Sequence, residues 1–492
     1  MKDKKIVGKI ILVMVCCVLW LDAFTVQTIF GADTNKTGVI IVHWYEYGRY
    51  NNEYFEVPID GSVDLRKEIQ SICDFAKDKG TKDKPVQITF PRGTFMVSNS
   101  IVLYSNVRIT GYGNNVNGTV FRVSGNKPNP FFINGKYGIG KDQGAAGYYE
   151  NIAGTRLAAC NIIIEKIYFD KSRIMSMSQG NNIVLQNLTG SGLAKTHEIE
   201  VCACEDVTIR NCVFNGGTLK NIAQSKAGEM LGCFEIIQLD VNTSKAFPYF
   251  GYYNGDSIGG EYYYRTNKNI TIENCRFTNV FVGVGSHAYS PNIAQENIQV
   301  RGCKFYRCFV AGVKFKHVNS FSVSGCKFEE CNRGIYYDGN VNKTPNETGM
   351  SDFDIMNQTI NTDKYTKVRN QNIKQTQIEI SGNQFKNVNS NIYVHQFQSG
   401  RNTMLDYALV QNNKLEFNQN FKNAKNLIVN YNPQEHFVAA VKDLLDSNNL
   451  DRDDRVAYLS GPFSEGAYSS ILQIMRVKDI LKGNSVVPPK SV

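Results

Sequence analysis

A short pattern that returns three times between residues 269 and 338 places the strongest constraint on the fold of this chain. Each copy opens on an alternating strand, turns through a polar pair and then shows a Phe two residues after a Cys. Repeats of about 20 to 30 residues built from short β segments are typical of a solenoid in which each repeat forms one coil. Because one coil cannot bury its own apolar face, the copies are expected to stack. The three Cys/Phe pairs, separated by 28 and then 23 residues, are Cys275/Phe277, Cys303/Phe305 and Cys326/Phe328.

The repeated cysteines are expected to lie inside the resulting tube as small apolar side chains. Cys212, in an earlier copy, is also followed by a Phe two residues later. Stacked coils lie about 4.8 Å apart, so these thiols would form a buried ladder and not disulfides. The alternative for the cysteines outside the ladder is a metal site formed by Cys202, Cys204 and Cys233.

The chain begins with a basic and then apolar segment that is typical of a secretory signal peptide. An apolar run from Ile10 to Leu21 follows several lysines, and the small residues Gly31 and Ala32 come after it. We therefore predict that residues 1–32 are removed, that the protein is secreted, and that it has no membrane span after cleavage. The alternative is an uncleaved N-terminal anchor. The formal net charge of +9 suits an anionic partner without requiring one.

A predicted amphipathic helix and two strand-rich segments follow the leader. The helix begins near residue 64, and the segments are ITFPRGTFMV at 88–97 and IVLYSNVRITGYG at 101–113. This order resembles the opening of pectate-lyase-like right-handed parallel β-helix proteins, and the resemblance extends over about residues 58–432. It implies that the helix caps the open end of the tube, where strand edges would otherwise recruit other chains. It does not choose an activity, because this fold carries lyases, hydrolases, epimerases and binding modules.

The predicted fold class is therefore all-β, a right-handed parallel β-helix with an N-terminal capping helix. The β-helix domain is expected to span residues 33–432. Residues 433–492 show helical spacing at 434–446 and 465–481 and are predicted to form a C-terminal helical cap or appendage. Two insertions, at 216–268 and 339–376, interrupt the repeat, and such insertions often build the binding face of a solenoid.

The strands that close successive coils carry a column of polar and ionisable side chains. Their second and fourth residues are mostly apolar and are predicted to face inward, so that the third and fifth residues face outward. The third residues are Gln238, Gly285, Lys314, Tyr336 and Tyr393. The fifth residues are Asp240, His287, Lys316, Asp338 and His395.

This column is the predicted site. Adjacent members would lie about 5 Å apart, close enough to shift one another's pKa. Gly285 is expected to leave open space for a ligand, and the Tyr-rich loop 249–264 is expected to stack on a sugar. The alternative is that these side chains only keep an outer sheet soluble, with opposite charges paired across it. The predicted catalytic residues are Asp240, His287 and Lys316, and the predicted substrate-binding residues are Gln238, Lys314, Tyr336, Asp338, Tyr253 and Tyr263.

Two reactions on an acidic polysaccharide fit the column. Hydrolysis needs a carboxylic acid and a carboxylate, which Asp240 could form with Asp256 or Glu235. β-Elimination needs a base and a cation that neutralises the substrate carboxylate. The candidate bases are Lys316, Lys314 and His287.

The order of these residues is also similar to that of polygalacturonases. Asp240 is followed by Gly-x-Gly-Ser-His at 283–287 and by Gly-Val-Lys-Phe-Lys at 312–316. Polygalacturonases have aspartates, a Gly-His segment and then a basic Arg-Ile-Lys segment in this order. Their paired aspartates, in Asn-Thr-Asp and Asp-Asp, are absent here, so the resemblance transfers only to Asp240.

The sequence thus predicts a secreted protein that acts on carbohydrate. An enzyme, either a glycoside hydrolase or a polysaccharide lyase, is favoured over a non-catalytic polysaccharide-binding or adhesion module. The predicted partner is an acidic polysaccharide, and no nucleic-acid motif is visible. No cofactor is predicted; Ca²⁺ is the alternative, although no cluster of several acids is evident. A monomer and an oligomer both stay open.

Overall fold

The computed structural model describes most of the repeat region and parts of the chain around it. The predicted leader, the Tyr-rich loop, most of the insertion at 339–376 and the predicted C-terminal helices lie outside the described residues. The described residues are 40–43, 49–50, 53–54, 58–125, 129–134, 159–193, 197–216, 235–240, 266–286, 295–316, 318, 320–338, 376–388, 390–395, 405–417, 425–430 and 485–487.

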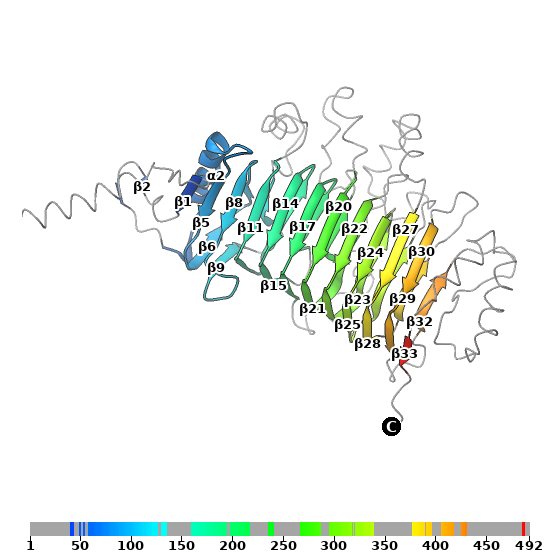
Figure 1. Cartoon of the computed structure of the whole chain (residues 1–492). Helices are drawn as coiled ribbons and strands as arrows, with labels where there is room; N and C mark the ends of the chain where they lie inside the picture. The colour runs from blue at the N-terminus through cyan, green and yellow to red at the C-terminus, as the bar shows by residue number, and fades with distance from the viewer. Residues whose placement is uncertain are drawn as a thin grey trace, which may run out of the picture.

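The described strands of the repeats stack in parallel into three ladders that run along the tube (Figure 1). The first ladder is an 11-stranded sheet within the described residues. Apolar side chains alternate along its strands, and Ile270 pairs with Ile298 as Ile272 pairs with Val300. In order it contains β1 (Ile40–His43), β5 (Val86–Thr89), β8 (Val107–Thr110), β11 (Ile162–Glu165), β14 (Asn181–Gln186), β17 (Glu205–Arg210), β20 (Lys268–Glu273), β22 (Glu296–Arg301), β24 (Ser320–Ser324), β27 (Thr376–Ser381) and β30 (Leu405–Gln411).

The second ladder follows the first through a tight turn in each coil. Most of these turns contain one residue with positive φ, such as Asn274 (54°), Gly302 (63°) and Gly325 (62°), which explains why Asn or Gly precedes the repeated Cys. The ladder contains β4 (Asp60–Asp64), β6 (Gly93–Val97), β9 (Thr119–Val123), β12 (Tyr168–Asp170), β15 (Thr189–Leu193), β18 (Val213–Gly216), β21 (Arg276–Gly285), β23 (Lys304–Lys316), β25 (Lys327–Glu329), β28 (Gln384–Val388), β31 (Lys414–Phe417) and β33 (Ser485–Val487).

The third ladder closes each coil and carries the predicted site. The long strands β21 and β23 pass from the second ladder into the third, so the two ladders form one hydrogen-bonded sheet. A separate antiparallel pair joins β2 (Arg49–Tyr50) to β3 (Glu53–Tyr54). Besides β21 and β23, the third ladder contains β7 (Ile101–Val102), β10 (Pro130–Ile133), β13 (Arg173–Ser178), β16 (Ile199–Cys202), β19 (Glu235–Asp240), β26 (Arg333–Asp338), β29 (Ser390–His395) and β32 (Lys425–Asn430).

These ladders confirm the predicted parallel β-helix. Near the N-terminal end, α2 (Arg66–Lys79) buries Ile69, Ile72 and Ala76 in the same apolar core as the coils. Its capping role stays a prediction. Within the range predicted as a helical appendage, β33 pairs in parallel with β31. Among the described residues, we find no helix with the length and apolar character needed to span a bilayer.

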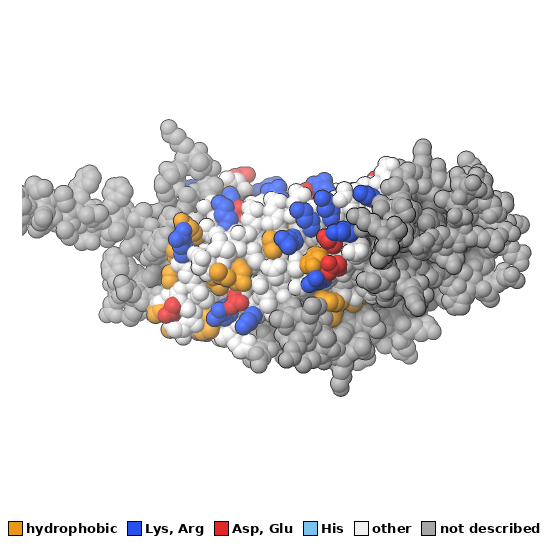
Figure 2. All heavy atoms as spheres, turned by 90° about the horizontal axis from the view of Figure 1, so that it is seen from below, with side chains coloured by type: hydrophobic (Ala, Val, Ile, Leu, Met, Phe, Trp, Pro, Cys, Tyr) orange, Lys and Arg blue, Asp and Glu red, His pale blue; other side chains and the backbone are white. Residues whose placement is uncertain are grey.

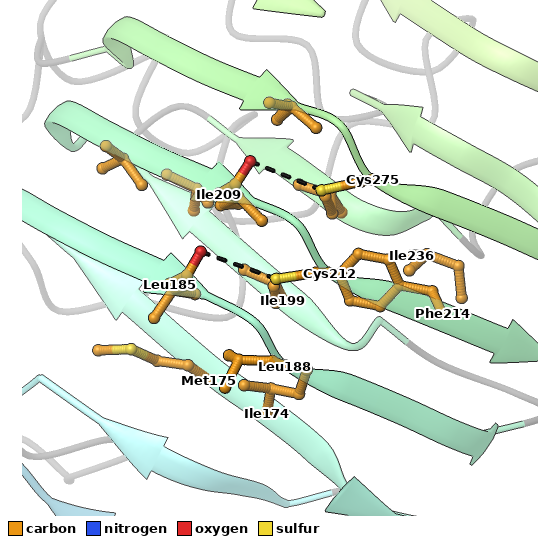
Figure 3. Close-up of a cluster of buried hydrophobic side chains, with 14 of the residues drawn as sticks. Ile174, Met175, Leu185, Leu188, Ile199, Ile209, Cys212, Phe214, Ile236 and Cys275 are labelled. Carbon is orange, nitrogen blue, oxygen red and sulfur yellow. Dashed lines mark hydrogen bonds between the residues drawn. The ribbon is translucent and has the colours of Figure 1, made fainter. Parts of the chain in front are cut away.

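The interior of the tube contains the predicted ladders of Cys and Phe. Cys212, Cys275, Cys303 and Cys326 are buried and free of disulfides. Each thiol points to a carbonyl oxygen of the preceding coil, and Figure 3 shows Cys212 and Cys275 doing so. The aromatic rings that follow these cysteines, together with Phe385, which follows Asn383, stack at nearly parallel angles. The centroids are 5.1 Å apart for Phe214 and Phe277 and 4.8 Å apart for Phe277/Phe305, Phe305/Phe328 and Phe328/Phe385.

We predict that Phe305→Ala lowers the free energy of unfolding by about 3–5 kcal/mol, because the cavity removes stacking on both sides of the ring. Chemical denaturation followed by circular dichroism measures this loss. The matched control is Tyr306→Ala, at the adjacent and only partly buried position, which should cost much less. Equal losses in the two variants would show that the ladder does not hold the coils together.

Candidate functional site

The strand register aligns the third residues of the predicted column across the third ladder. Gln238 lies opposite Gly285, Gly285 opposite Lys314, and Lys314 opposite Tyr336. Tyr336 in turn lies opposite Tyr393. These five residues are therefore consecutive members of one column along the tube, about 4.8 Å apart.

The fifth residues form a second column beside the first. Lys316 lies opposite Asp338, and Asp338 lies opposite His395. Asp240 occupies the same position two coils before Lys316 and lies opposite Cys202. His287, Tyr253, Tyr263 and Asp256 lie outside the described residues.

The inward positions are as predicted, but three of the outward side chains are buried. Ile237 and Leu239 belong to the apolar core. Gln238, Asp240 and Lys314 face away from that core, yet their exposed fractions are only 2%, 0% and 6%. These three members of the columns are therefore buried polar groups, which cost free energy on folding unless they are paired or hydrogen-bonded.

Two earlier strands extend this column toward the N-terminus with residues that the sequence analysis missed. Ser176 on β13 lies opposite Glu200 on β16, which lies opposite Gln238. Arg173, also on β13, forms a buried ion pair with Glu200, with 2.7 Å between Nη2 and Oε2. The hydroxyl of Ser176 donates to the same carboxylate oxygen over 2.8 Å.

Glu235 is the second buried carboxylate of the cluster and has two basic neighbours. Its Oε1 lies 3.4 Å from Nζ of Lys314, and its Oε2 lies 4.0 Å from Nδ1 of His197. Nδ1 of His197 is also 2.7 Å from the backbone oxygen of Glu235. Because that oxygen can only accept, Nδ1 carries the hydrogen and Nε2 is the accepting nitrogen of the neutral ring.

Gly285 makes room for a neighbouring side chain and not, as predicted, for a ligand. It was expected to leave open space for a ligand. A Cβ atom at Gly285 would lie 2.6 Å from Cγ of Glu235, so the Glu235 side chain already occupies that space. The missing side chain therefore allows Glu235 to lie over the strand and reach Lys314.

We call Arg173, His197, Glu200, Glu235, Gln238, Asp240 and Lys314 the charged cluster. Burial raises the pKa of Glu200, but Arg173, His197 and the hydrogen bond from Ser176 outweigh it and hold the pKa below its ordinary value. Glu200 is therefore ionised at neutral pH. Gln238 donates to Oδ2 of Asp240 within the same cluster. His197, at 14% exposure of its side chain, is more accessible than Arg173, Glu200, Glu235 or Lys314.

Glu198 is a buried carboxyl group that points the opposite way, into the tube. It precedes Ile199, and the residues at the same position in three later coils are Gly283, Gly312 and Gly334. A Cβ atom at those glycines would lie 2.4–2.6 Å from a ring of the Phe ladder. In the coil that contains Glu198, Gly190 occupies the position of the ladder Phe. Gly190 lies opposite Phe169 of one neighbouring coil and Phe214 of the other.

The carboxyl group of Glu198 fills the space that the missing ring leaves. A Cβ atom at Gly190 would lie 2.7 Å from Cδ of Glu198. Burial raises the pKa of Glu198 well above its ordinary value, although Arg173 lowers it in part. Burial therefore favours the protonated form of Glu198 in the folded protein, and the side chain has a structural role inside the tube.

Within the described residues, no group of three or more His, Cys, Asp or Glu side chains is placed to hold a metal ion. The charged cluster instead mixes carboxylates with Arg, Lys and His. Such a mixture can bind a charged sugar and move protons, since neighbouring acids and bases set one another's protonation.

The missed residues left only a weak signal in the sequence. The segment HEIEVC at 197–202 carries apolar residues at the same two inward positions as EIIQLD at 235–240. Aligning the two would have placed Glu200 beside Gln238. The segment RIMSMS at 173–178 has buried residues at every position, so alternation does not reveal which side Arg173 faces.

We predict that Glu198→Gln removes a pH dependence of stability. Above about pH 4.5 the unfolded chain ionises Glu198 while the folded chain keeps the proton, so wild-type stability falls as pH rises toward the raised pKa. Relative to the variant, wild type should lose up to about 1.4 kcal/mol per pH unit over that range. Denaturation at pH 5, 6, 7 and 8 tests this, with the exposed Glu379→Gln as control. A constant difference between wild type and Glu198→Gln would contradict it.

Comparison with two solved structures of an adhesin supports the fold. Two structures of PfbA, a surface adhesin of Streptococcus pneumoniae, share 16% identity over 79% of this chain, with TM-scores of 0.55 and 0.54. The matches cover 82% and 88% of those chains. The tailspike protein of E. coli bacteriophage HK620 shares 14% identity over 79% of this chain and 65% of its own, with a TM-score of 0.45.

The family assignment rests on the sequence. No curated protein matches this chain. A family model described as "Rhamnogalacturonase A/epimerase, pectate lyase-like" matches residues 51–336, which is more than half of the 492 residues. The chain therefore belongs to this pectate-lyase-like family of parallel β-helix proteins.

Proposed function

We propose that the chain is a secreted enzyme that hydrolyses an acidic, uronate-containing polysaccharide at the charged cluster. The observation that supports this most is the burial of Arg173, Glu200, Glu235 and Lys314 on the outer side of the tube. Buried ion pairs usually contribute no more to stability than apolar side chains of the same size. Carboxyl and basic groups that perturb one another gather at functional sites. The family description, which names a rhamnogalacturonase, supports a polysaccharide substrate.

Hydrolysis assigns different tasks to Glu200 and Asp240, two of the three carboxyl groups of the charged cluster, which lie on adjacent strands. Glu200 is ionised, and its contacts with Arg173 and Ser176 converge on Oε2. Its Oε1 is therefore the oxygen that would activate water or attack the sugar. Asp240, which Gln238 contacts, would protonate the leaving oxygen. Because the pKa of Glu200 is lowered, its active form should persist into mildly acidic solution.

The basic members of the cluster would bind the acidic sugar. Lys314 and Arg173 lie on either side of Glu235 and Glu200, and either cation can attract a uronate carboxylate when substrate enters. The roles predicted for His287 and Lys316 in catalysis stay part of this proposal. So do the binding roles of Gln238, Lys314, Tyr336, Asp338, Tyr253 and Tyr263.

β-Elimination is the second candidate, and His197 is the observation that favours it. Its accepting nitrogen is Nε2, and it is more exposed than the ion-paired members of the cluster. A neutral imidazole can remove the proton beside a uronate carboxylate while Arg173 or Lys314 neutralises that carboxylate. Elimination leaves an unsaturated uronate, and hydrolysis leaves a new reducing end without one.

We predict that Glu200→Gln lowers kcat/KM by about 100-fold or more on whichever polysaccharide the wild type cleaves, because the ionised oxygen is lost. A panel of polygalacturonate, rhamnogalacturonan and other uronate polymers should be assayed for reducing ends and for absorbance of unsaturated uronate. The control is Glu379→Gln, which neutralises an exposed carboxylate on the first ladder.

The outcomes separate the candidates. Reducing ends without absorbance support hydrolysis, and both together support elimination, in which case His197→Gln should lose activity as well. Binding without any product supports a non-catalytic module, as in the surface adhesin PfbA. Equal turnover by wild type and Glu200→Gln would contradict the proposed role of the cluster.

A further inference from the structure

We propose that the second ladder carries a separate binding surface for an anionic polysaccharide. The surface is a row of exposed cations, Arg276, Lys304, Lys327 and Lys414, which we call the basic strip. Its members open the second-ladder strands β21, β23, β25 and β31. The inference stands apart from the charged cluster, which lies on the third ladder.

The strand register holds the basic strip in one line. Arg276 lies opposite Lys304, and Lys304 lies opposite Lys327. The next two members of the column are the neutral Gln384 and then Lys414. Adjacent members are about 4.8 Å apart, so the strip extends about 19 Å along the tube.

Like charges in this arrangement are unfavourable without a partner. Cations directly opposite one another on neighbouring strands repel and destabilise the sheet. Nearby carboxylates do not relieve the repulsion, since Glu329 is paired with Lys386 at 2.9 Å and Glu330 with Arg307 at 2.7 Å. Across the described parts of the chain, no ion pair joins a carboxylate to a member of the strip.

The molecular surface shows the same excess of positive charge. On the face drawn in Figure 2, Lys and Arg side chains gather toward the C-terminal half of the described surface, with a few Asp and Glu side chains among them. Two further cations nearby, Arg307 and Lys386, are each paired with a glutamate, whereas among the described residues the members of the strip are not. The strip therefore keeps a positive potential that attracts an anion.

The shape of the strip selects the class of anion. It is one side chain wide and runs along the tube, so it fits a single extended polymer with one negative charge per unit. Each sugar of a 1,4-linked uronate chain advances the chain by about the distance between two stacked coils. Single-stranded nucleic acid would also need aromatic platforms for its bases. The neighbouring aromatic, Tyr306, already has the Arg307 guanidinium 4.7 Å from its ring centroid.

We predict that the triple variant Arg276→Gln, Lys304→Gln and Lys327→Gln binds polygalacturonate at least about tenfold more weakly than wild type at low salt. Wild-type affinity should fall steeply between about 50 and 200 mM salt, and the variant should show a shallower dependence. Biolayer interferometry with immobilised polygalacturonate measures both. The triple variant should keep or raise the melting temperature, because the repulsion is gone.

Three controls make the outcome decisive. The variant Lys79→Gln, Lys82→Gln and Lys166→Gln removes the same charge from exposed positions elsewhere and should bind as wild type does. Glu200→Gln should also retain strip binding, which separates this inference from the proposed catalysis. Uncharged dextran should not bind. Wild-type affinity in the strip triple variant, or no binding of polygalacturonate by wild type, would overturn the proposal. Tighter strip-dependent binding of oligo-dT would assign the surface to nucleic acid instead.

Discussion

The rings of Phe277, Phe305 and Phe328 stack with centroids 4.8 Å apart and planes within 4° of parallel. This spacing is the one that hydrogen bonds impose between neighbouring strands. Every coil must therefore place the same kind of side chain at the same position, or compensate nearby. The Gly190 coil shows the compensation: where the ring is missing, the carboxyl group of Glu198 takes its place. The ladder thus fits the pitch of the tube, and the gap in it at Gly190 holds an interior acid.

The same spacing has a different consequence on the outside of the tube. There it pairs Arg173 with Glu200 and Glu235 with Lys314, and these four residues come from four different strands. It also lines up Arg276, Lys304 and Lys327, whose charges repel. In the first case the charges are paired and buried, and in the second they are exposed and of one sign. A stacked solenoid can therefore build a buried charged cluster and a linear charged surface from the same coils.

The repeat was readable from the sequence because its period and its alternation of side chains agree. Cys275, Phe277 and their equivalents predicted the coils, and the alternation correctly separated Ile237 and Leu239 from Gln238 and Asp240. Burial of the outward residues was not predictable, since alternation gives the direction of a side chain and not what surrounds it.

Two features of the charged region could be recognised only in the folded structure and not from the sequence. Glu198 and Ile199 are consecutive and both buried, which breaks the alternation. Only the register shows that Glu198 points at Gly190. The pairing of Arg173 with Glu200 joins two coils whose strands differ in pattern, and Gly285 receives Glu235 from the coil before it. These contacts depend on register between coils, which a single sequence does not state.

The central claim is that the charged cluster exists for chemistry on a polysaccharide and not for stability. The double variant Arg173→Met with Glu200→Leu tests it most directly, because it replaces a buried ion pair with apolar side chains of similar size. Unfolding free energy and polysaccharide turnover should be measured on the same preparation. The account predicts equal or greater stability together with loss of turnover. Lower stability with unchanged turnover would contradict it and make the cluster a structural element of the tube.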